Sequence, residues 1–131
     1  MRRRTDRRLS MAALILLVED NEDNIITVAD YLAFKGYRVE VAHTGQEALE
    51  FCQANTPELI LMDIQMPGMS GIEAIQLLRQ RPPTAVTPIF AVTALVMAGD
   101  RERCLEAGAN EYLSKPLHMR GLLETIQQYL S

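Results

Sequence analysis

The 131-residue chain is 48% hydrophobic and 23% charged, the balance of an ordinary globular domain that buries roughly two-thirds of its unfolded surface. Its net charge of −4 combines +4 in residues 1–9, from five arginines and one aspartate, with −8 in the remainder, from eight basic and sixteen acidic residues. No apolar run approaches the roughly 18 residues of a membrane span, and the arginine-rich start is unlike a signal peptide, so the sequence argues against membrane insertion and secretion.

Residues 1–11 are a basic arm that we expect to be disordered, and residues 12–131 are expected to form one domain. Basic arms can contact nucleic acid, but the acidic remainder of this chain would repel phosphate backbones. We therefore predict no direct nucleic-acid partner. The arm ends at a second methionine, Met11, where the functional chain could begin.

The first part of the domain alternates apolar runs with helical patterns. Residues 14–18 are a short apolar run that predicts a buried strand, and residues 19–24 are acidic and cap-forming. Apolar residues at helical spacing then predict a helix that ends before Gly36. Residues 37–42 alternate apolar and polar side chains, as a less buried strand does, and a second helix is expected to open at Thr44.

The second part continues the same alternation. A third apolar run, residues 59–63, ends in an aspartate and is followed closely by a loop that contains Pro67-Gly68. Ser70 and Glu73 have the spacing of a capping box, which predicts the start of a third helix. Strands are expected over residues 89–94 and 110–114, each followed by a helix. Five βα units in strict alternation predict an α/β fold, a doubly wound parallel sheet with five helices.

Charged and hydroxyl side chains fall at the ends of these strands. Glu19 and Asp20 follow the first strand, and Asp63 ends the third. Thr93 lies near the end of the fourth strand, and Lys115 follows the fifth. Because the carboxyl ends of parallel strands share one edge, we expect three acids, one hydroxyl and one ammonium to converge on one crevice.

Such a cluster of acids is costly. Carboxylates about 5 Å apart repel by roughly 3 kcal/mol per pair at an effective dielectric near 20, so three pairs cost on the order of 10 kcal/mol. That is comparable to the whole stability of a domain, and one lysine cannot offset it. Either the acids bind protons or a divalent cation lies among them, and hard oxygen ligands favour Mg²⁺.

Four motifs resemble the signature set of response-regulator receiver domains, in particular the chemotaxis-regulator type. They are VEDN at 18–21, MDIQMPGMSG at 62–71, TA at 93–94 and KP at 115–116. The resemblance runs from about Leu14 to Tyr129, nearly the whole chain, with every motif in order. It implies a flavodoxin-like sheet with the strand order 2-1-3-4-5.

The resemblance also implies roles for individual residues. Asp63 would be the phospho-acceptor, forming an acyl phosphate. Asp20 and Asp63 would hold Mg²⁺, or Mn²⁺ in its place, together with the backbone carbonyl of Gln65. Glu19 would contact the metal ion through water. Together these residues would form the metal site.

Further residues would bind the phosphoryl group and report its presence. Lys115 and the backbone N–H of Ala94 would bind the phosphoryl oxygens. Thr93 and Tyr112 would act as the switch, Thr93 turning toward the phosphoryl group and Tyr112 moving inward. The Lys115-Pro116 peptide bond is expected to be cis.

The resemblance implies partners as well. A sensor histidine kinase or a histidine phosphotransfer protein in the cytoplasm would donate the phosphoryl group. A downstream protein would bind the face made by the fourth helix, the fifth strand and the fifth helix. Cys52 and Cys104 are far apart in sequence and lack metal-ligand spacing, as expected of free thiols in a reduced cytoplasm.

Two other functions remain open from the residues. One is a Mg²⁺-dependent hydrolase with an aspartyl phosphate intermediate, although such an enzyme normally has a second acid where Gln65 stands. The other is a receiver-like module that binds partners without phosphorylation. Taken alone, Asp63 could be a strand-end cap and Tyr112 ordinary packing. His43 and His118 are expected to be surface residues.

Overall fold

The computed structural model describes residues 12–94 and 97–130, so the basic arm over residues 1–11 lies outside it. Its strands form one parallel sheet in the order β2-β1-β3-β4-β5, which confirms the predicted fold class and strand order. The strands are β1 Leu14–Val18, β2 Arg38–Ala42, β3 Leu59–Asp63, β4 Ile89–Thr93 and β5 Glu111–Ser114. The helices are α2 Glu22–Phe34, α3 Gly45–Ala54, α4 Gly71–Arg79, the 3₁₀ turn η1 Pro82–Thr84, α5 Asp100–Ala107 and α6 Met119–Leu130.

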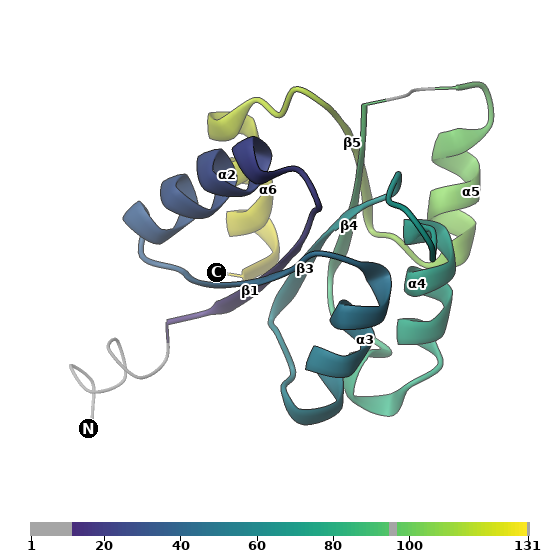
Figure 1. Cartoon of the computed structure of the whole chain (residues 1–131). Coiled ribbons are helices and arrows are strands. Elements are labelled where there is room, and N and C mark those ends of the chain that lie inside the picture. The colour runs from purple at the N-terminus through teal and green to yellow at the C-terminus, as the bar shows by residue number, and fades with distance from the viewer. Residues whose placement is uncertain (1–11, 95–96, 131) are drawn as a thin grey trace.

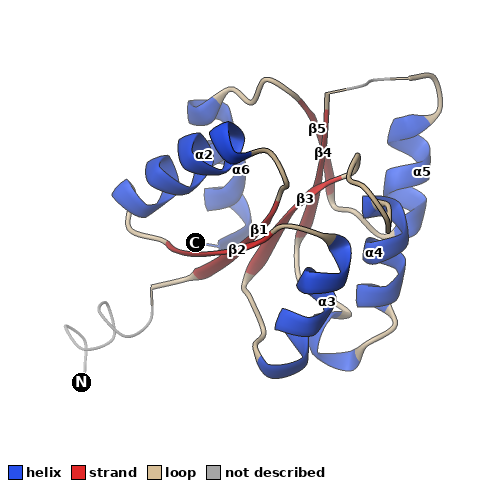
Figure 2. Ribbon diagram, in the orientation of Figure 1, coloured by secondary structure: helices blue, strands red, loops and turns tan. Residues whose placement is uncertain are grey.

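The sheet is a central layer with helices on both faces (Figures 1 and 2). Helices α2 and α6 cover one face, and α3, α4 and α5 cover the other. Because side chains alternate along a strand, Ile15 and Leu17 pack toward α2 and α6, whereas Leu16 and Val18 pack toward the opposite helices. Every residue of β1, β3 and β4 is buried, which explains why these strands are continuous apolar runs.

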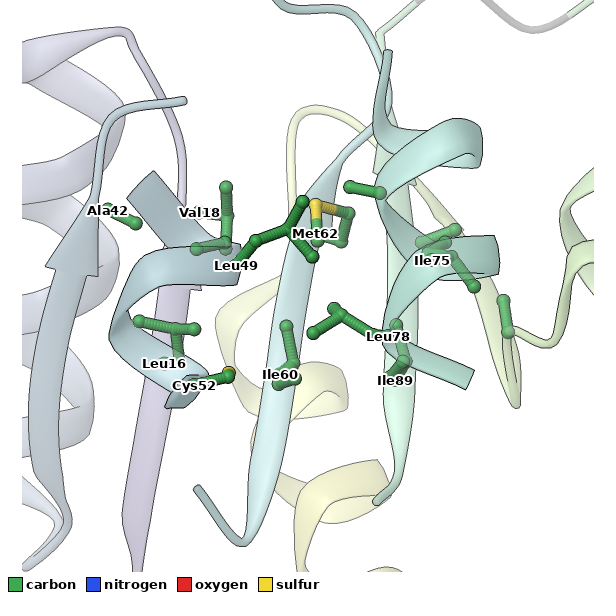
Figure 3. Packing of buried hydrophobic residues seen from close by; sticks show 14 of the residues in the cluster. Leu16, Val18, Ala42, Leu49, Cys52, Ile60, Met62, Ile75, Leu78 and Ile89 are labelled. Carbon is green, nitrogen blue, oxygen red and sulfur yellow. The ribbon is translucent and has the colours of Figure 1, made fainter. Parts of the chain in front are cut away.

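The core on the α3–α4–α5 face is built mainly from aliphatic side chains of four strands, β1 to β4, and of all three helices, and Figure 3 shows part of it. Leu49 from α3 and Leu78 from α4 reach down onto Ile60 and Met62 of β3. Cys52 lies in the same core and is a free thiol, as predicted, and so is Cys104. These contacts hold β3, and therefore its last residue, in a rigid position at the middle of the sheet.

The predicted helix starts are confirmed by their cap hydrogen bonds. The side chains of Asn21, Thr44 and Ser70 accept from the backbone N–H groups three residues further on, at 2.9, 3.0 and 3.2 Å. Strand ends differ slightly from the prediction, because β4 ends at Thr93 and β5 begins at Glu111. None of the helices within residues 12–94 and 97–130 has the length and hydrophobicity of a membrane span.

The Arg79 side chain links several elements at the edge of the molecule opposite to the acids. The sequence did not predict these contacts. The Arg79 Nε and Nη2 donate to the carbonyl of Gly108 at 2.9 and 2.8 Å, and its Nη1 donates to the carbonyl of Thr84 at 2.9 Å. Nη2 also donates to Oδ1 of Asn110 at 2.9 Å, and the same oxygen accepts from the backbone of Ile89 at 2.8 Å. One guanidinium thus joins α4, η1, the α5–β5 loop and the start of β4.

We expect Arg79→Met to destabilise the protein by about 2–3 kcal/mol, because it leaves several partly buried carbonyls without a donor. Urea unfolding measures this difference. Arg81→Met is the matched control, since the Arg81 guanidinium donates from Nη1 to the carbonyl of Leu49 at 2.8 Å and lies on the same segment. Equal losses in the two variants would contradict a special role for Arg79.

Candidate functional site

The acidic side chains lie where β1 and β3 end side by side. Val18 pairs with Met62 in the parallel ladder, so the residues that follow them, Glu19 and Asp63, are neighbours. Glu19 is 4% exposed and Asp63 is 3% exposed, whereas Asp20 lies at the surface in the loop to α2. The strand register alone therefore brings the three predicted acids to one rim.

The Lys115 side chain reaches these acids from the β5 side of the sheet. Lys115 follows β5, and its backbone N–H donates to the carbonyl of Thr93 at 2.8 Å. Its Nζ lies 2.8 Å from Oε1 of Glu19 and 3.3 Å from Oδ2 of Asp63. The ammonium therefore bridges two buried carboxylates, an arrangement in which losing one partner leaves a buried charge uncompensated. The peptide bond from Lys115 to Pro116 is cis.

Burial sets the charge state at the centre of the site. Removal from water raises the pKa of Asp63 from an ordinary 3.8 to about 6; the backbone N–H of Gln65 and the Lys115 ammonium favour the ionised form, and Glu19 opposes it. Burial alone would lower the pKa of Lys115, but the two carboxylates outweigh it and raise that pKa above its usual value. Lys115 is thus cationic at neutral pH, while Asp63 holds a proton more readily than an exposed aspartate does.

The donor set suits a hard divalent cation. One oxygen from each of Glu19, Asp20 and Asp63 can be chosen so that all three lie within 4.8 Å of one another. Carboxylate oxygens are ligands that Mg²⁺ prefers, and the exposed Asp20 leaves the group open to the water that Mg²⁺ retains. Lys115 offsets only one of the three negative charges. The residues present therefore fit a magnesium ion.

The predicted switch residues occupy different depths in the fold. Thr93 ends β4, is 1% exposed, and donates its hydroxyl to Oε1 of Gln65 at 3.1 Å. Ala94 follows at the surface of the same rim. Tyr112 pairs with Ala91 below the rim and packs into the core on the α3–α4–α5 face. Within the described ranges, its buried hydroxyl has no hydrogen-bond partner.

Gly71 has a role that the sequence alone did not reveal, although it lies within the longest motif. A Cβ at this position would lie 2.5 Å from the carbonyl oxygen of Asp63 and 2.6 Å from Cα of Ile64. The N–H of Gly71 donates to the carbonyl of Ile64 at 3.0 Å. The start of α4 therefore rests directly on the backbone of Asp63, an approach that only glycine permits.

A small cavity of about 120 Å³ adjoins the acids on the α2–α6 side of the sheet. Its walls are mostly apolar and include Val28, Leu61, Leu117 and Met119. Glu19, Asp63 and Lys115 also line it. The bridged carboxylates are therefore reached from a hollow that lies between two helices and the sheet.

These observations can be compared with known proteins. The family profile described as "Response regulator receiver domain" matches residues 15–127. The chain belongs to this family. Receiver domains are signalling switches of two-component systems, generally not classed as enzymes, and they take phosphate from histidine kinases or phosphotransfer proteins.

Individual relatives agree with the family. The polar-differentiation response regulator DivK of Brucella ovis is 39% identical over 120 residues, which cover 92% of this chain and 98% of DivK. The chemotaxis protein CheY4 of Vibrio cholerae has a TM-score of 0.85 at 31% identity, over 90% of this chain and 98% of CheY4. The receiver domain of the sensor histidine kinase PA1611 of Pseudomonas aeruginosa has a TM-score of 0.84 at 36% identity, over 91% and 98% of the two chains. That structure has a magnesium ion coordinated in its active site cleft.

The raised pKa of Asp63 predicts how stability depends on pH in metal-free protein. The folded state holds the Asp63 proton up to about pH 6, whereas an ordinary aspartate loses it near 3.8, so the ionisation of Asp63 costs stability as pH rises through this range. We expect Asp63→Asn to unfold like the parent at pH 4 and to be more stable, by about 3 kcal/mol at most, at pH 7.5.

Urea unfolding in EDTA at both pH values measures this difference. Added Mg²⁺ is expected to stabilise the parent and not the variant. A variant less stable than the parent at pH 7.5 in EDTA would overturn the account of Asp63.

Gly71→Ala is expected to destabilise this receiver domain by about 1–3 kcal/mol, because the added methyl group forces the Asp63 backbone and the start of α4 apart. Gly121→Ala in α6 is the matched control, since its Cβ would meet only the His118 side chain at 3.2 Å. Thermal unfolding compares the two, and alanine, which favours a helix more than glycine does, should be neutral or stabilising at the control position. The idea fails if both variants melt alike.

Proposed function

We propose that this receiver domain accepts a phosphoryl group on Asp63 from a phosphohistidine and that phosphorylation changes which proteins it binds. The observation that carries the proposal is the buried Asp63 carboxylate, 3.3 Å from the Lys115 ammonium. It lies at the carboxyl ends of the strands, where open α/β sheets bind their ligands. Glu19 and Asp20 beside it complete a set of acids that fits Mg²⁺.

In the transfer, a carboxylate oxygen of Asp63 forms a bond to phosphorus while the P–N bond to the donor imidazole breaks. The electron pair of that bond stays on the imidazole nitrogen. Lys115 remains beside the reacting carboxylate and offsets charge on the phosphoryl oxygens. When bound, Mg²⁺, or Mn²⁺ as a substitute, supplies the positive charge that keeps Asp63 ionised and further neutralises these oxygens.

The proposed metal ligands are those that the resemblance to receiver domains implies. Asp20 and Asp63 would bind the ion directly, together with the backbone carbonyl of Gln65. Glu19 would act through water, which its existing contacts support: Oε1 pairs with Lys115 at 2.8 Å, and Oε2 accepts from the N–H of Asn21 at 3.1 Å. Both oxygens of Glu19 are thus already engaged.

Phosphorylation would then rearrange the switch residues. The Lys115 ammonium and the N–H of Ala94 would hold the phosphoryl oxygens, and the Thr93 hydroxyl would turn toward them. Tyr112 would move into the space that Thr93 leaves. The buried Tyr112 hydroxyl supports this step, because a polar group that finds no partner among the described residues is unfavourable where it stands.

We assign the donor to a sensor histidine kinase or a histidine phosphotransfer protein, and the chain to the cytoplasm where such donors act. The output surface is the face of α5, β5 and α6, the fourth helix, fifth strand and fifth helix of the sequence prediction. A groove on β5 and α6 supports this assignment. It is lined by Tyr112, Leu113, Ser114, Pro116, Leu117, His118, Gly121, Leu122 and Thr125.

The two other functions lack a supporting observation. A hydrolase with an aspartyl phosphate intermediate would need an acid at position 65, but Gln65 stands there and donates its backbone N–H to Asp63. A module that binds partners without phosphorylation would be expected to lack part of the site. Here the acids, Thr93 and Lys115 are all present at one rim.

Incubation with acetyl phosphate and Mg²⁺ tests the acceptor. We expect an acid-stable, hydroxylamine-labile label on the parent and at least about a 100-fold loss in Asp63→Asn, because an amide cannot replace the attacking carboxylate. Asp20→Asn should also lose most of the label, through loss of Mg²⁺. Asp23→Asn, an exposed acid in the first turn of α2, is the matched control and should label normally.

Peptide mapping of the labelled parent places the phosphate. A label on another residue, or undiminished labelling of folded Asp63→Asn, would reject Asp63 as the acceptor. Continuous phosphate release from varied phosphate esters would instead favour the hydrolase.

A further inference from the structure

The Gln65 side chain makes a contact that the proposed function does not use. Its amide oxygen Oε1 accepts the hydroxyl hydrogen of Thr93 at 3.1 Å. The backbone N–H of the same residue donates to Oδ1 of Asp63 at 3.0 Å. Gln65 therefore touches both the acceptor carboxylate and the switch hydroxyl, which lie on different strands.

A hydroxyl group has one hydrogen to donate. While Thr93 gives it to Gln65, the same hydrogen cannot be given to a phosphoryl oxygen on Asp63. The two hydrogen bonds are therefore alternatives, and the bond to Gln65 favours the unphosphorylated arrangement. Thr93 is 1% exposed, so water does not readily replace Gln65 as its acceptor.

We propose that the Gln65 side chain is a positioning residue that restrains the switch by holding the Thr93 hydroxyl away from the phosphoryl site. This inference rests on the proposed roles of Asp63 and Thr93. Because the restraint is one hydrogen bond between neutral groups, its removal should shift the switch equilibrium by roughly 3- to 10-fold. The backbone carbonyl of Gln65, a proposed metal ligand, is unaffected by a change of side chain.

Gln65→Met removes the acceptor oxygen and keeps the length of the side chain. We expect this variant to bind beryllium fluoride, a phosphoryl mimic, roughly 3- to 10-fold more tightly than the parent in saturating Mg²⁺. In methyl-labelled protein without the mimic, the Thr93 methyl resonance should move toward its position in the beryllofluoride complex.

Two further comparisons separate the restraint from a general loosening of the loop. Gln46→Met in α3 is the matched control, because the Gln46 side chain donates to Glu50 on the exposed surface, and it should bind the mimic like the parent. The effect of Gln65→Met should vanish in a Thr93→Val background and return in Thr93→Ser, which restores the hydroxyl. A tightening that persists with Thr93→Val would overturn the inference.

Failure of this inference and failure of the proposed function give different results. If the parent is phosphorylated on Asp63 but Gln65→Met binds the mimic with parental affinity, only the restraint is rejected. If Asp63→Asn binds beryllium fluoride as well as the parent does, the acceptor assignment itself fails.

Discussion

Like charges held at the end of a buried sheet are the constraint on which the rest of the site depends. Strands β1 and β3 are enclosed by helices on both faces, so Glu19, directly after β1, and Asp63, the last residue of β3, are buried as well. Because Asp63 ends a buried strand, its carboxylate is buried too, and this burial raises the pKa of the carboxylate. The uncompensated negative charge of the site therefore favours binding of a cation.

The single positive charge of Lys115 offsets only part of the negative charge of these acids. It is shared between Glu19 and Asp63, with the shorter contact, 2.8 Å, to Glu19. The lysine thus lies closer to Glu19 than to Asp63, the proposed acceptor, while still contacting both. Metal, lysine and phosphoryl group can then coexist around one carboxylate.

Much of this arrangement could be predicted from the sequence. Cap residues such as Ser70 and buried runs such as residues 59–63 indicate the elements, and parallel topology places Glu19, Asp63 and Lys115 on one edge. The contacts of Arg79 could not be predicted, because its acceptors are mostly backbone carbonyls. Every residue has such a carbonyl, so the sequence does not indicate which ones will accept from Arg79. The Thr93 contact joins side chains 28 residues apart and depends on the conformation of a loop.

Arg79 also bears on how a signal leaves the site. It ties the carbonyl of Gly108, directly after α5, to the end of α4, whereas the opposite end of α5 at Asp100 follows the segment that leaves Thr93. The Gly108 end of this helix is anchored to α4, and the other end follows Thr93, a proposed switch residue, along the chain. Displacement of α5 should therefore resemble the swing of a pivoted rod, small near Gly108 and greatest at its first turn.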